Sequence, residues 1–448
     1  MEDKKVILDK PMYTETKRKL LGEVTYYRYL TNGIEDMLTP KHDEEILVKL
    51  RNVDITYGSG SKAFKAVSDF SLNIYKGEVL GLVGESGSGK STIGKTLVGL
   101  VPYSFGEIKL LEKTLPKKLK RGFKFGKALK EYKEIENFMV NKVQMIFQDP
   151  ANSLNPHVNV EAVVSEGLEN TKNSKEIYLY NIDQEIEKEL YQNFLDAKKH
   201  PNFFGDYKRN LGFKIAENEV ASFEALYVNM LNDLAKANLH EAAKWLTDKK
   251  AEREELSKLS EKECKRILVV EMLKSVGLDE AVLRRYPLEF SGGQQQRIGI
   301  SRSVVLRPQL LVADEPISAL DVSIQAQVVN IFNELKEKYN LTILFIAHDL
   351  RMVEYISDRI AVMNRGRLLE IGKTEEIMNH SLHPYTKSLL DAVPSIHGTK
   401  GSLIGYVYNP LDHGYTDEIQ PEWIKINDDH YVLATPQEVV KWKEEFWK

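Results

Sequence analysis

The chain has 448 residues, 42% hydrophobic and 29% charged, a composition that predicts a folded soluble protein and excludes a disordered or fibrous one. Its 62 basic and 66 acidic residues leave a net charge of −4, which gives no indication of a nucleic-acid-binding surface. A single cysteine, Cys264, excludes an intrachain disulfide framework and a metal site built only from this chain's thiolates. The N-terminus lacks the apolar core of a signal peptide, and no run approaches the ~20 apolar residues that cross a bilayer. Any work at a membrane is therefore expected to require docking onto a spanning partner.

The pattern of the chain changes at residue 46. Residues 1–45 are polar and rich in Tyr and Lys, and we expect them to form a peripheral extension. Residues 46–57 alternate like a half-buried strand, and two strands with a turn at Gly77 follow. The second of these, VLGLVG, is a continuous apolar run, which is typical of a strand buried on both faces. A helix is expected from about Ser91 to Leu100.

Further apolar runs predict strands at 142–147, 310–313 and 342–347, and the segments between these strands are helical in character. Alternation of strands and helices favours an α/β fold with a mainly parallel sheet. Residues 113–130 interrupt this rhythm with eight Lys or Arg and no acid. They are interpreted as a solvated basic loop or, alternatively, as a contact for phosphate head groups or acidic protein.

Residues 170–262 also interrupt the α/β pattern, because they are strongly helical in character, with 17 acidic and 15 basic side chains. Within them apolar residues recur every three or four positions, which predicts one buried helix face in a small bundle: Val220, Phe223, Tyr227, Met230 and Leu234. The last residues, from 421, contain too many Trp and Tyr for a loose tail, so we expect a small ordered appendage.

Residues 84–91, GESGSGKS, match G-x-x-x-x-G-K-[ST] between a buried strand and a helix, the context that a phosphate-binding loop requires. Glycines let the backbone wrap around a phosphate, and the helix dipole adds positive potential. Lys90 is expected to reach the β- and γ-phosphates, and the Ser91 hydroxyl to ligate Mg²⁺. The predicted nucleotide-binding residues of this segment are Gly84, Glu85, Ser86, Gly87, Ser88, Gly89, Lys90, Ser91 and Thr92.

Polar side chains follow several of the other predicted strands. LLVADEP ends a buried strand in two carboxylates, of which Asp314 suits the magnesium shell and Glu315 suits a general base that polarises the attacking water. His348 follows another strand and could contact the γ-phosphate, although a histidine there is usually structural. Gln148 can coordinate Mg²⁺ loosely. Tyr57, 33 residues before Lys90, could stack on adenine or be an ordinary strand aromatic.

A second glycine-rich turn, EFSGGQQQRIGIS, opens a helix at Ser291 although a complete phosphate loop is already present. A helix N-terminus with a serine hydroxyl and glycine amides is an anion site. It is not redundant if Ser291, Gly292, Gly293 and Gln294 close over the ATP of a partner chain, in a head-to-tail pair.

These segments resemble the ABC ATPases. The glycine loop, IFQDP, FSGGQ, LLVADEP, SALD and FIAHD occur in the family's order between Ile46 and Pro394, and the resemblance places Asp321 of SALD at the nucleotide. QDPANSLNP and HPYTKSLLDAVP look like the oligopeptide/dipeptide importer ATPases, and the C-terminal tail is similar to that of their F-type subunit. The implied fold is an α/β P-loop ABC ATPase cassette, with a mainly parallel core sheet, an antiparallel β subdomain, an enlarged α-helical subdomain and a C-terminal extension.

The resemblance implies five segments: an N-terminal extension (1–45), ABC core (46–169), helical insertion (170–262), ABC core (263–380) and an importer-type C-terminal extension (381–448). It also implies a peripheral subunit on the cytoplasmic face of the cell membrane that binds ATP and Mg²⁺ and hydrolyses ATP. The implied partners are a second ABC ATPase subunit, two transmembrane permease subunits and, through them, an extracytoplasmic peptide-binding protein, with no nucleic acid.

Some features depart from the family pattern. The signature begins with Phe290 where Leu is commoner, and Gln295 stands where these importers usually have Arg. About 142 residues separate Gln148 from Ser291, an excess that the 170–262 insertion accounts for. Some relatives bind an iron–sulfur cluster through C-terminal cysteines, which this chain lacks. The insertion is expected to touch the partner ATPase or the membrane subunits.

Other functions within the class remain open at this stage. The substrate could be a dipeptide or a metal chelate. A chromosome-maintenance or DNA-repair ATPase is disfavoured because its insertion would be a long heptad coiled coil. A translation factor would carry two cassettes in one chain, and the HPYTKSLL segment weakens the interpretation as an exporter ATPase. A non-catalytic subunit is disfavoured because Glu315 and His348 are both present.

Overall fold

The computed structural model describes residues 11–19, 22–41, 44–119, 126–149, 153–318, 320–391, 408–416 and 418–447. Parts of four expected features lie outside these ranges: the start of the N-terminal extension, the middle of the basic stretch, the residues just after Gln148, and 392–407 of the C-terminal extension. The chain divides into two compact units, Met1–Asp149 with Pro308–Lys448, and Pro150–Arg307. The five-segment division stays a prediction.

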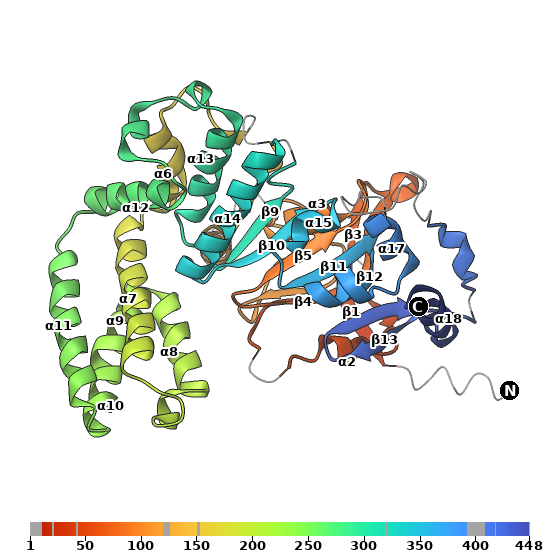
Figure 1. Cartoon of the computed structure of the whole chain (residues 1–448), viewed down its shortest axis with the longest axis horizontal. Coiled ribbons are helices and arrows are strands. Elements are labelled where there is room, and N and C mark those ends of the chain that lie inside the picture. Colours follow the sequence, from red (N-terminus) through yellow and green to blue (C-terminus); the bar gives the residue numbers. More distant parts are fainter. Residues whose placement is uncertain are drawn as a thin grey trace. The chain divides into compact units, whose positions relative to one another are not determined.

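The first unit is built on an eight-stranded sheet (Figure 1). Its strands, in spatial order, are β13 (Glu422–Asn427), β14 (His430–Ala434), β12 (Arg367–Lys373), β11 (Arg359–Asn364), β5 (Val79–Val83), β10 (Thr342–Ala347), β9 (Leu310–Asp314) and β8 (Val143–Ile146). The five strands from β11 to β8 run parallel, and the other three are antiparallel to their neighbours. Every residue of β5, β9 and β10 is buried, as the continuous apolar runs predicted.

Two helices hold the central strands from opposite faces. α3 (Lys90–Leu97) packs where Gly94 approaches Val312 and Ile346, and α15 (Leu350–Glu354) packs where Gly81 approaches Val353. The register pairs Ile346 with Leu82, the residue after Gly81, and successive residues of a strand point to opposite faces, so α3 and α15 pack on opposite faces of the sheet. The expected helix after the glycine loop is therefore present but ends at Leu97 rather than Leu100. The remaining helices of this unit are α2 (Ile34–Leu38), η2 (Gly60–Lys62), α4 (Gly126–Lys142), α14 (Val322–Tyr339), α16 (Thr374–His380), α17 (Pro384–Asp391), η7 (Pro410–His413) and α18 (Pro436–Phe446).

A second, antiparallel sheet has the order β4-β3-β6-β7. Its strands are β3 (Ile46–Tyr57), β4 (Phe64–Tyr75), β6 (Phe105–Leu110) and β7 (Lys113–Thr114). β3 has the predicted bounds, and β4 and β5 are the two strands that were expected after it, on either side of Gly77. The interpretation of the basic stretch as a loop was wrong at both of its described ends, because β7 forms at one end and α4 begins at the other.

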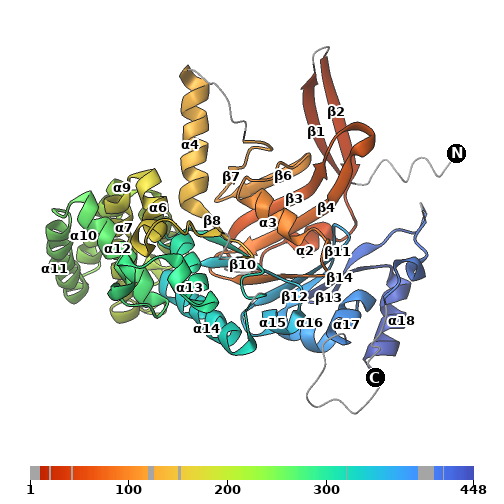
Figure 2. The same cartoon turned by 90° about the horizontal axis from the view of Figure 1, so that it is seen from above.

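The N-terminal extension contains a hairpin of β1 (Met12–Lys19) and β2 (Gly22–Tyr29), which lies beside β3 and β4 in Figure 2. One face of the hairpin is attached to the antiparallel sheet. The Tyr13 and Phe105 rings meet edge to face at 5.4 Å, and the Arg28 guanidinium donates to Asp54 at 2.6 Å. These contacts tie the extension to the subdomain that follows it.

The second unit is helical, as the composition of 170–262 predicted. Its helices are α6 (Val160–Thr171), α7 (Ser174–Asn193), η3 (Pro201–Phe203), α8 (Asp206–Glu217), α9 (Glu219–Glu224), the π-helix η4 (Ala225–Met230), α10 (Leu231–Lys236), α11 (His240–Leu256), α12 (Glu261–Ser275), η5 (Glu280–Arg284), η6 (Pro287–Glu289) and α13 (Gly292–Val304). Residues of α7 to α11 form a hydrophobic core of their own, which makes the insertion a small bundle.

The predicted apolar face of this bundle was correct at Tyr227, Met230 and Leu234, which are buried, and wrong at Val220, which is 74% exposed. The π-helical turn explains the difference, because it takes more residues per turn than an α-helix. Counting back along the chain from Met230, the buried face therefore reaches Ser222, whereas the 3.6-residue period had placed Val220 on that face.

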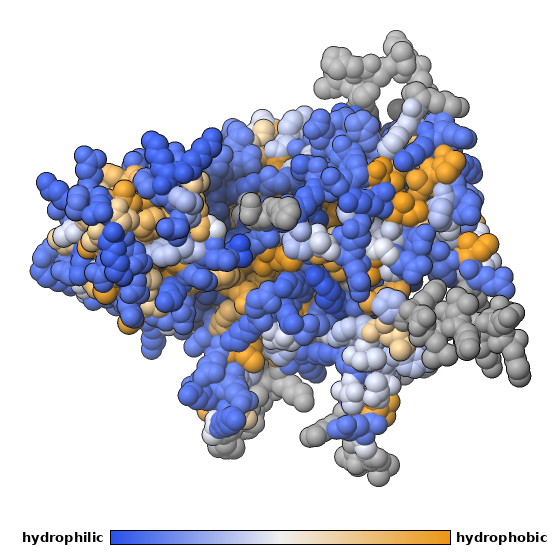
Figure 3. Space-filling model, turned by 90° about the horizontal axis from the view of Figure 1, so that it is seen from below, coloured by the Kyte–Doolittle hydropathy of each residue, from blue (hydrophilic) through white to orange (hydrophobic). Residues whose placement is uncertain are grey.

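Hydrophilic residues cover most of the face in Figure 3, with hydrophobic residues in small groups. None of the helices in the described ranges combines the length and the apolarity that a bilayer crossing requires.

Candidate nucleotide-binding site

The predicted phosphate loop connects β5 to α3. Gly84, Gly87 and Gly89 have φ angles of 157°, 82° and 103°, values that L side chains rarely adopt, which explains why glycine occupies these positions. A Cβ atom on Gly84 would lie 2.0 Å from the main-chain oxygen of Met363, so the start of the loop passes directly against the end of β11. The loop is thus held from outside by the neighbouring strand.

The Lys90 ammonium lies inside this loop. It donates to the main-chain oxygens of Gly84 at 2.6 Å and Glu85 at 2.9 Å. Burial lowers the pKa of Lys90 below its usual value, against the opposing effect of the nearby carboxylates Glu315 and Asp314. A phosphate held by the loop amides would contact the Lys90 ammonium at this position. Without a phosphate, the two loop carbonyls orient the ammonium.

The two residues predicted to hold magnesium lie together. The Ser91 hydroxyl donates to Asp314 Oδ1 at 2.7 Å, which joins the first turn of α3 to the end of β9. Burial raises the pKa of Asp314, and the Ser91 hydrogen bond opposes this effect. A hydroxyl and a carboxylate side by side, with a destabilised negative charge, are ligands of the kind that Mg²⁺ prefers. The residues present therefore fit the ion.

The three predicted catalytic side chains meet at the carboxyl ends of β8, β9 and β10. Gln148 Nε2 donates to Glu315 Oε2 at 3.0 Å, and His348 Nδ1 lies 3.6 Å from the same oxygen. Glu315 has a φ of 46°, an uncommon conformation for a residue with a side chain, and its N–H donates to the Ile346 carbonyl of the next strand. The main chain thus turns sharply at the end of β9 to aim this carboxylate.

The remaining residues expected at the nucleotide in this unit differ in exposure. Tyr57 ends β3 with 42% of its surface exposed, and its hydroxyl lies 3.4 Å from Thr92 Oγ1 on α3. An aromatic ring is therefore available beside the helix that follows the phosphate loop. Ser86 is exposed and Ser88 is buried. Asp321 caps α14 by accepting from the Ile324 N–H at 3.0 Å.

The signature residues lie in the second unit, at the start of α13. Ser291 and Gln294 form a reciprocal cap, in which each side chain accepts from the other residue's N–H, and Gly292 and Gly293 make up the first turn between them. The Gln295 amide, one of the departures from the family pattern noted above, donates to the carbonyls of Pro287 and Phe290, both at 3.1 Å. Gln295 therefore anchors the segment before the helix.

One contact of the phosphate loop was missed by sequence reasoning. The Glu85 N–H donates to the Tyr385 hydroxyl at 2.8 Å, although 300 residues separate the two. Tyr385 belongs to the HPYTKSLL segment, which the family resemblance identified without assigning it a role. No spacing rule connects it to the loop, so only the folded chain shows the contact.

Two family models match the chain: "ABC transporter" over residues 67–318, and "Oligopeptide/dipeptide transporter, C-terminal region" over residues 369–414. The first match covers more than half of the chain. The chain belongs to the ABC transporter family. It is an ATP-binding ATPase subunit, and such subunits pair and work with transmembrane permease components.

Curated relatives align with nearly the whole chain. The dipeptide transport ATP-binding protein DppF of Lactococcus lactis is 39% identical over 402 residues, covering 89% of this chain and 97% of the relative. The oligopeptide transport ATP-binding proteins OppF of Streptococcus mutans and Bacillus subtilis are 37% and 35% identical, over 89% and 88% of this chain and 97% and 98% of their own lengths.

Proposed function

We propose that this chain is the ATP-hydrolysing motor subunit of an importer for oligopeptides. The observation that carries the proposal is the combination of a phosphate loop, paired Ser91–Asp314 and clustered Gln148–Glu315–His348 with the oligopeptide/dipeptide C-terminal region. Two of the three relatives described above are named for oligopeptides and one for dipeptides. Import of dipeptides is therefore the second candidate.

In the proposed mechanism the loop amides of residues 84–92 bind the ATP phosphates, and Tyr57 stacks on the adenine. Ser91 and Asp314 would hold Mg²⁺, with Gln148 as a further ligand, and the ion would neutralise charge on the phosphates. Lys90 leaves the loop carbonyls and neutralises the phosphate oxygens.

Glu315 accepts the proton of the attacking water at its carboxylate, as general base. Its carboxylate is positioned by the Gln148 amide and lies within reach of His348, which is proposed to contact the γ-phosphate and to hold the water and Glu315 in line. Because Gln148 starts the segment that leads out of β8, a change at the ATP phosphates is expected to reach that segment first.

The proposed assembly is a heterodimer with a second ABC ATPase subunit, in which Ser291, Gly292, Gly293 and Gln294 close over the partner's ATP, and Asp321 lies beside the nucleotide. Two permease subunits and, through them, an extracytoplasmic peptide-binding protein complete the complex, with no nucleic acid. This chain would lie on the cytoplasmic face of the membrane. The self-contained Ser291–Gln294 cap supports this role, because it preorganises a helix N-terminus, which is an anion site.

The test is ATP-dependent trapping with Glu315→Gln, which keeps the shape of the side chain and removes the base. Tagged chain is purified from membrane extracts with ATP and Mg²⁺, and the complex is weighed by mass photometry. We expect a complex with a second ATPase and two membrane proteins for Glu315→Gln, and a shorter-lived one for the matched surface change Glu375→Gln. Trapping of the chain with itself alone, or with DNA, would contradict the proposal.

Uptake of labelled peptides by cells that lack the gene, with and without complementation, separates the two substrate candidates. Restored uptake of pentapeptides supports oligopeptide import. Restored uptake of dipeptides alone would replace it with the dipeptide function.

A further inference from the structure

Tyr385 is a buried side chain that the proposed mechanism does not use. It lies in the first turn of α17 and is 1% exposed, yet its hydroxyl is at the outer surface of the phosphate loop. There it accepts the Glu85 N–H at 2.8 Å. A side chain from the C-terminal region thus bonds to the main chain of the phosphate loop.

The peptide group between Gly84 and Glu85 is consequently held on both sides. Its N–H, that of Glu85, donates to the Tyr385 hydroxyl, and its carbonyl, that of Gly84, accepts from the Lys90 ammonium, which also donates to the Glu85 carbonyl. The Tyr385 hydroxyl therefore fixes the orientation of the peptide that positions Lys90. Without this hydroxyl the Glu85 N–H would lose its partner, and the start of the loop would have more than one accessible orientation.

α17 is itself held by a buried ion pair. The Glu370 carboxylate accepts the N–H groups of Leu382 at 2.7 Å and His383 at 3.3 Å, so it caps the start of this helix. Glu370 also contacts His430 Nε2, at 2.8 Å, and both side chains are fully buried. Burial raises the pKa of Glu370 and the His430 hydrogen bond and charge lower it, with a net pKa below the usual value.

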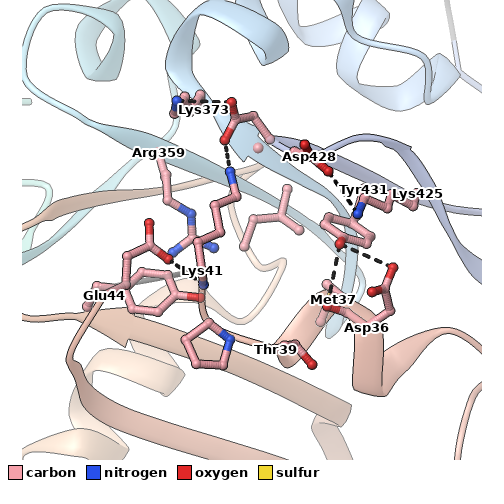
Figure 4. A pocket seen from close by; sticks show the side chains of 15 residues that line it. Asp36, Met37, Thr39, Lys41, Glu44, Arg359, Lys373, Lys425, Asp428 and Tyr431 are labelled. Carbon is pink, nitrogen blue, oxygen red and sulfur yellow. Dashed lines mark hydrogen bonds and ion pairs between the residues drawn. The ribbon is translucent and has the colours of Figure 1, made fainter.

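His430 is the first residue of β14, so the ion pair connects the C-terminal hairpin β13–β14 to the helix that carries Tyr385. The tip of this hairpin is fixed to the core at the preceding residue. Asp429 pairs with Lys41 and, at 2.9 Å, with Lys373, along the wall of a cavity of about 420 Å³ (Figure 4). A continuous series of contacts thus runs from the hairpin through Glu370 and α17 to the phosphate loop.

We propose that Tyr385 is a positioning residue for the phosphate-binding loop, and that the C-terminal hairpin influences ATP affinity through His430, Glu370 and Tyr385. The inference rests on the proposed role of residues 84–92 in binding the ATP phosphates. It predicts that a residue that never touches ATP affects its binding and leaves the chemical step unchanged.

The experiment is a titration of the purified full-length chain with a fluorescent ATP analogue in Mg²⁺. Tyr385→Phe removes only the hydroxyl, and we expect the Kd to rise about twofold to tenfold, the equivalent of one hydrogen bond of about 0.5–1.5 kcal/mol. Tyr103→Phe is the matched control, because Tyr103 is also buried and its hydroxyl donates to the Leu115 carbonyl at 2.7 Å, away from the loop. It should leave the Kd unchanged.

The contribution of the hairpin is tested by a double-mutant cycle. His430→Asn removes the nitrogen that contacts Glu370, whereas His430→Gln keeps an amide at that reach. His430→Asn should raise the Kd in the wild-type background, have no further effect in Tyr385→Phe, and differ from His430→Gln, which should resemble wild type. An equal effect of His430→Asn in both backgrounds would overturn the proposed link.

Lys90→Ala separates this inference from the site on which it rests. If Lys90→Ala binds the analogue normally, the proposed nucleotide site is wrong. If Lys90→Ala loses binding while Tyr385→Phe retains the wild-type Kd, only the positioning role of Tyr385 fails. A rise in Kd for Tyr103→Phe as large as that for Tyr385→Phe would equally refute this positioning role. Should His430→Asn not fold, the Tyr385→Phe and Tyr103→Phe pair still decides the role of Tyr385. In the assembled transporter, Tyr385→Phe should raise KM for ATP without lowering kcat.

Discussion

Acidification should lower the free energy of unfolding of this protein through one buried histidine, His383. The imidazole is 1% exposed, packs 5.4 Å from the Trp442 ring, and accepts the Tyr385 N–H at Nδ1, a bond that requires this nitrogen to be unprotonated. Burial lowers the pKa of His383 to about 4. The substitution to test is His383→Asn, because the asparagine oxygen can accept the same N–H and does not titrate.

The sign of the effect follows from linkage. In the unfolded chain the histidine titrates near its usual pKa of about 6.5, so below that pH the unfolded state binds a proton that the folded state refuses. The stabilisation is complete above pH 6.5 and is lost as the pH falls toward 4. One pKa unit corresponds to 1.36 kcal/mol, so the ~1.5 units between 6.5 and pH 5 amount to a loss of about 2 kcal/mol.

Equilibrium urea unfolding at pH 7 and pH 5 measures this loss, with tryptophan fluorescence as the signal. Three of the four tryptophans, Trp423, Trp442 and Trp447, lie in the C-terminal elements. Other titrating groups contribute equally to both proteins, so the informative quantity is the difference between wild type and His383→Asn. We expect that difference to shrink by about 2 kcal/mol from pH 7 to pH 5. A difference that does not change with pH would refute the assignment of a neutral buried His383.

Three further predictions follow from the two units. Gly84→Ala should lower the free energy of unfolding by about 3 kcal/mol, because the new Cβ would overlap a main-chain oxygen. Gly87→Ala has open space around the new Cβ and should lower it by about 1 kcal/mol. Thermal unfolding without nucleotide compares the two variants. Asp314→Asn should raise the nucleotide-free Tm at pH 7, because burial disfavours the carboxylate, and should abolish ATP hydrolysis, and a lower Tm would contradict this reasoning. Arg253→Met should destabilise the helical insertion by about 3–5 kcal/mol, because it leaves the fully buried Asp183 carboxylate without its cation, although the Ser222 and Tyr227 hydroxyls still donate to it; adding Asp183→Asn should restore part of the loss in a urea titration.

The sequence alone was sufficient to predict features that depend on neighbouring residues. The buried strand, glycine loop and helix around Lys90 are consecutive, and their pattern of apolar residues and glycines is local. The meeting of Gln148, Glu315 and His348 was also predictable, because each follows an apolar strand, and neighbouring parallel strands end at the same edge of a sheet. The sites of these side chains are thus a consequence of strand pattern and parallel topology.

Only the tertiary structure decided which distant segments meet. The C-terminal hairpin adds to the main sheet by pairing with β12, the π-helical turn moves the buried face of the insertion away from Val220, and Tyr385 contacts a loop 300 residues away. Periodicity reports whether a side chain is buried and says nothing about its partner, because burial is non-directional whereas a hydrogen bond joins two particular atoms. The hydroxyl of Tyr385 acquires its place at the phosphate loop only when the sheet, α17 and the Glu370–His430 pair assemble around it.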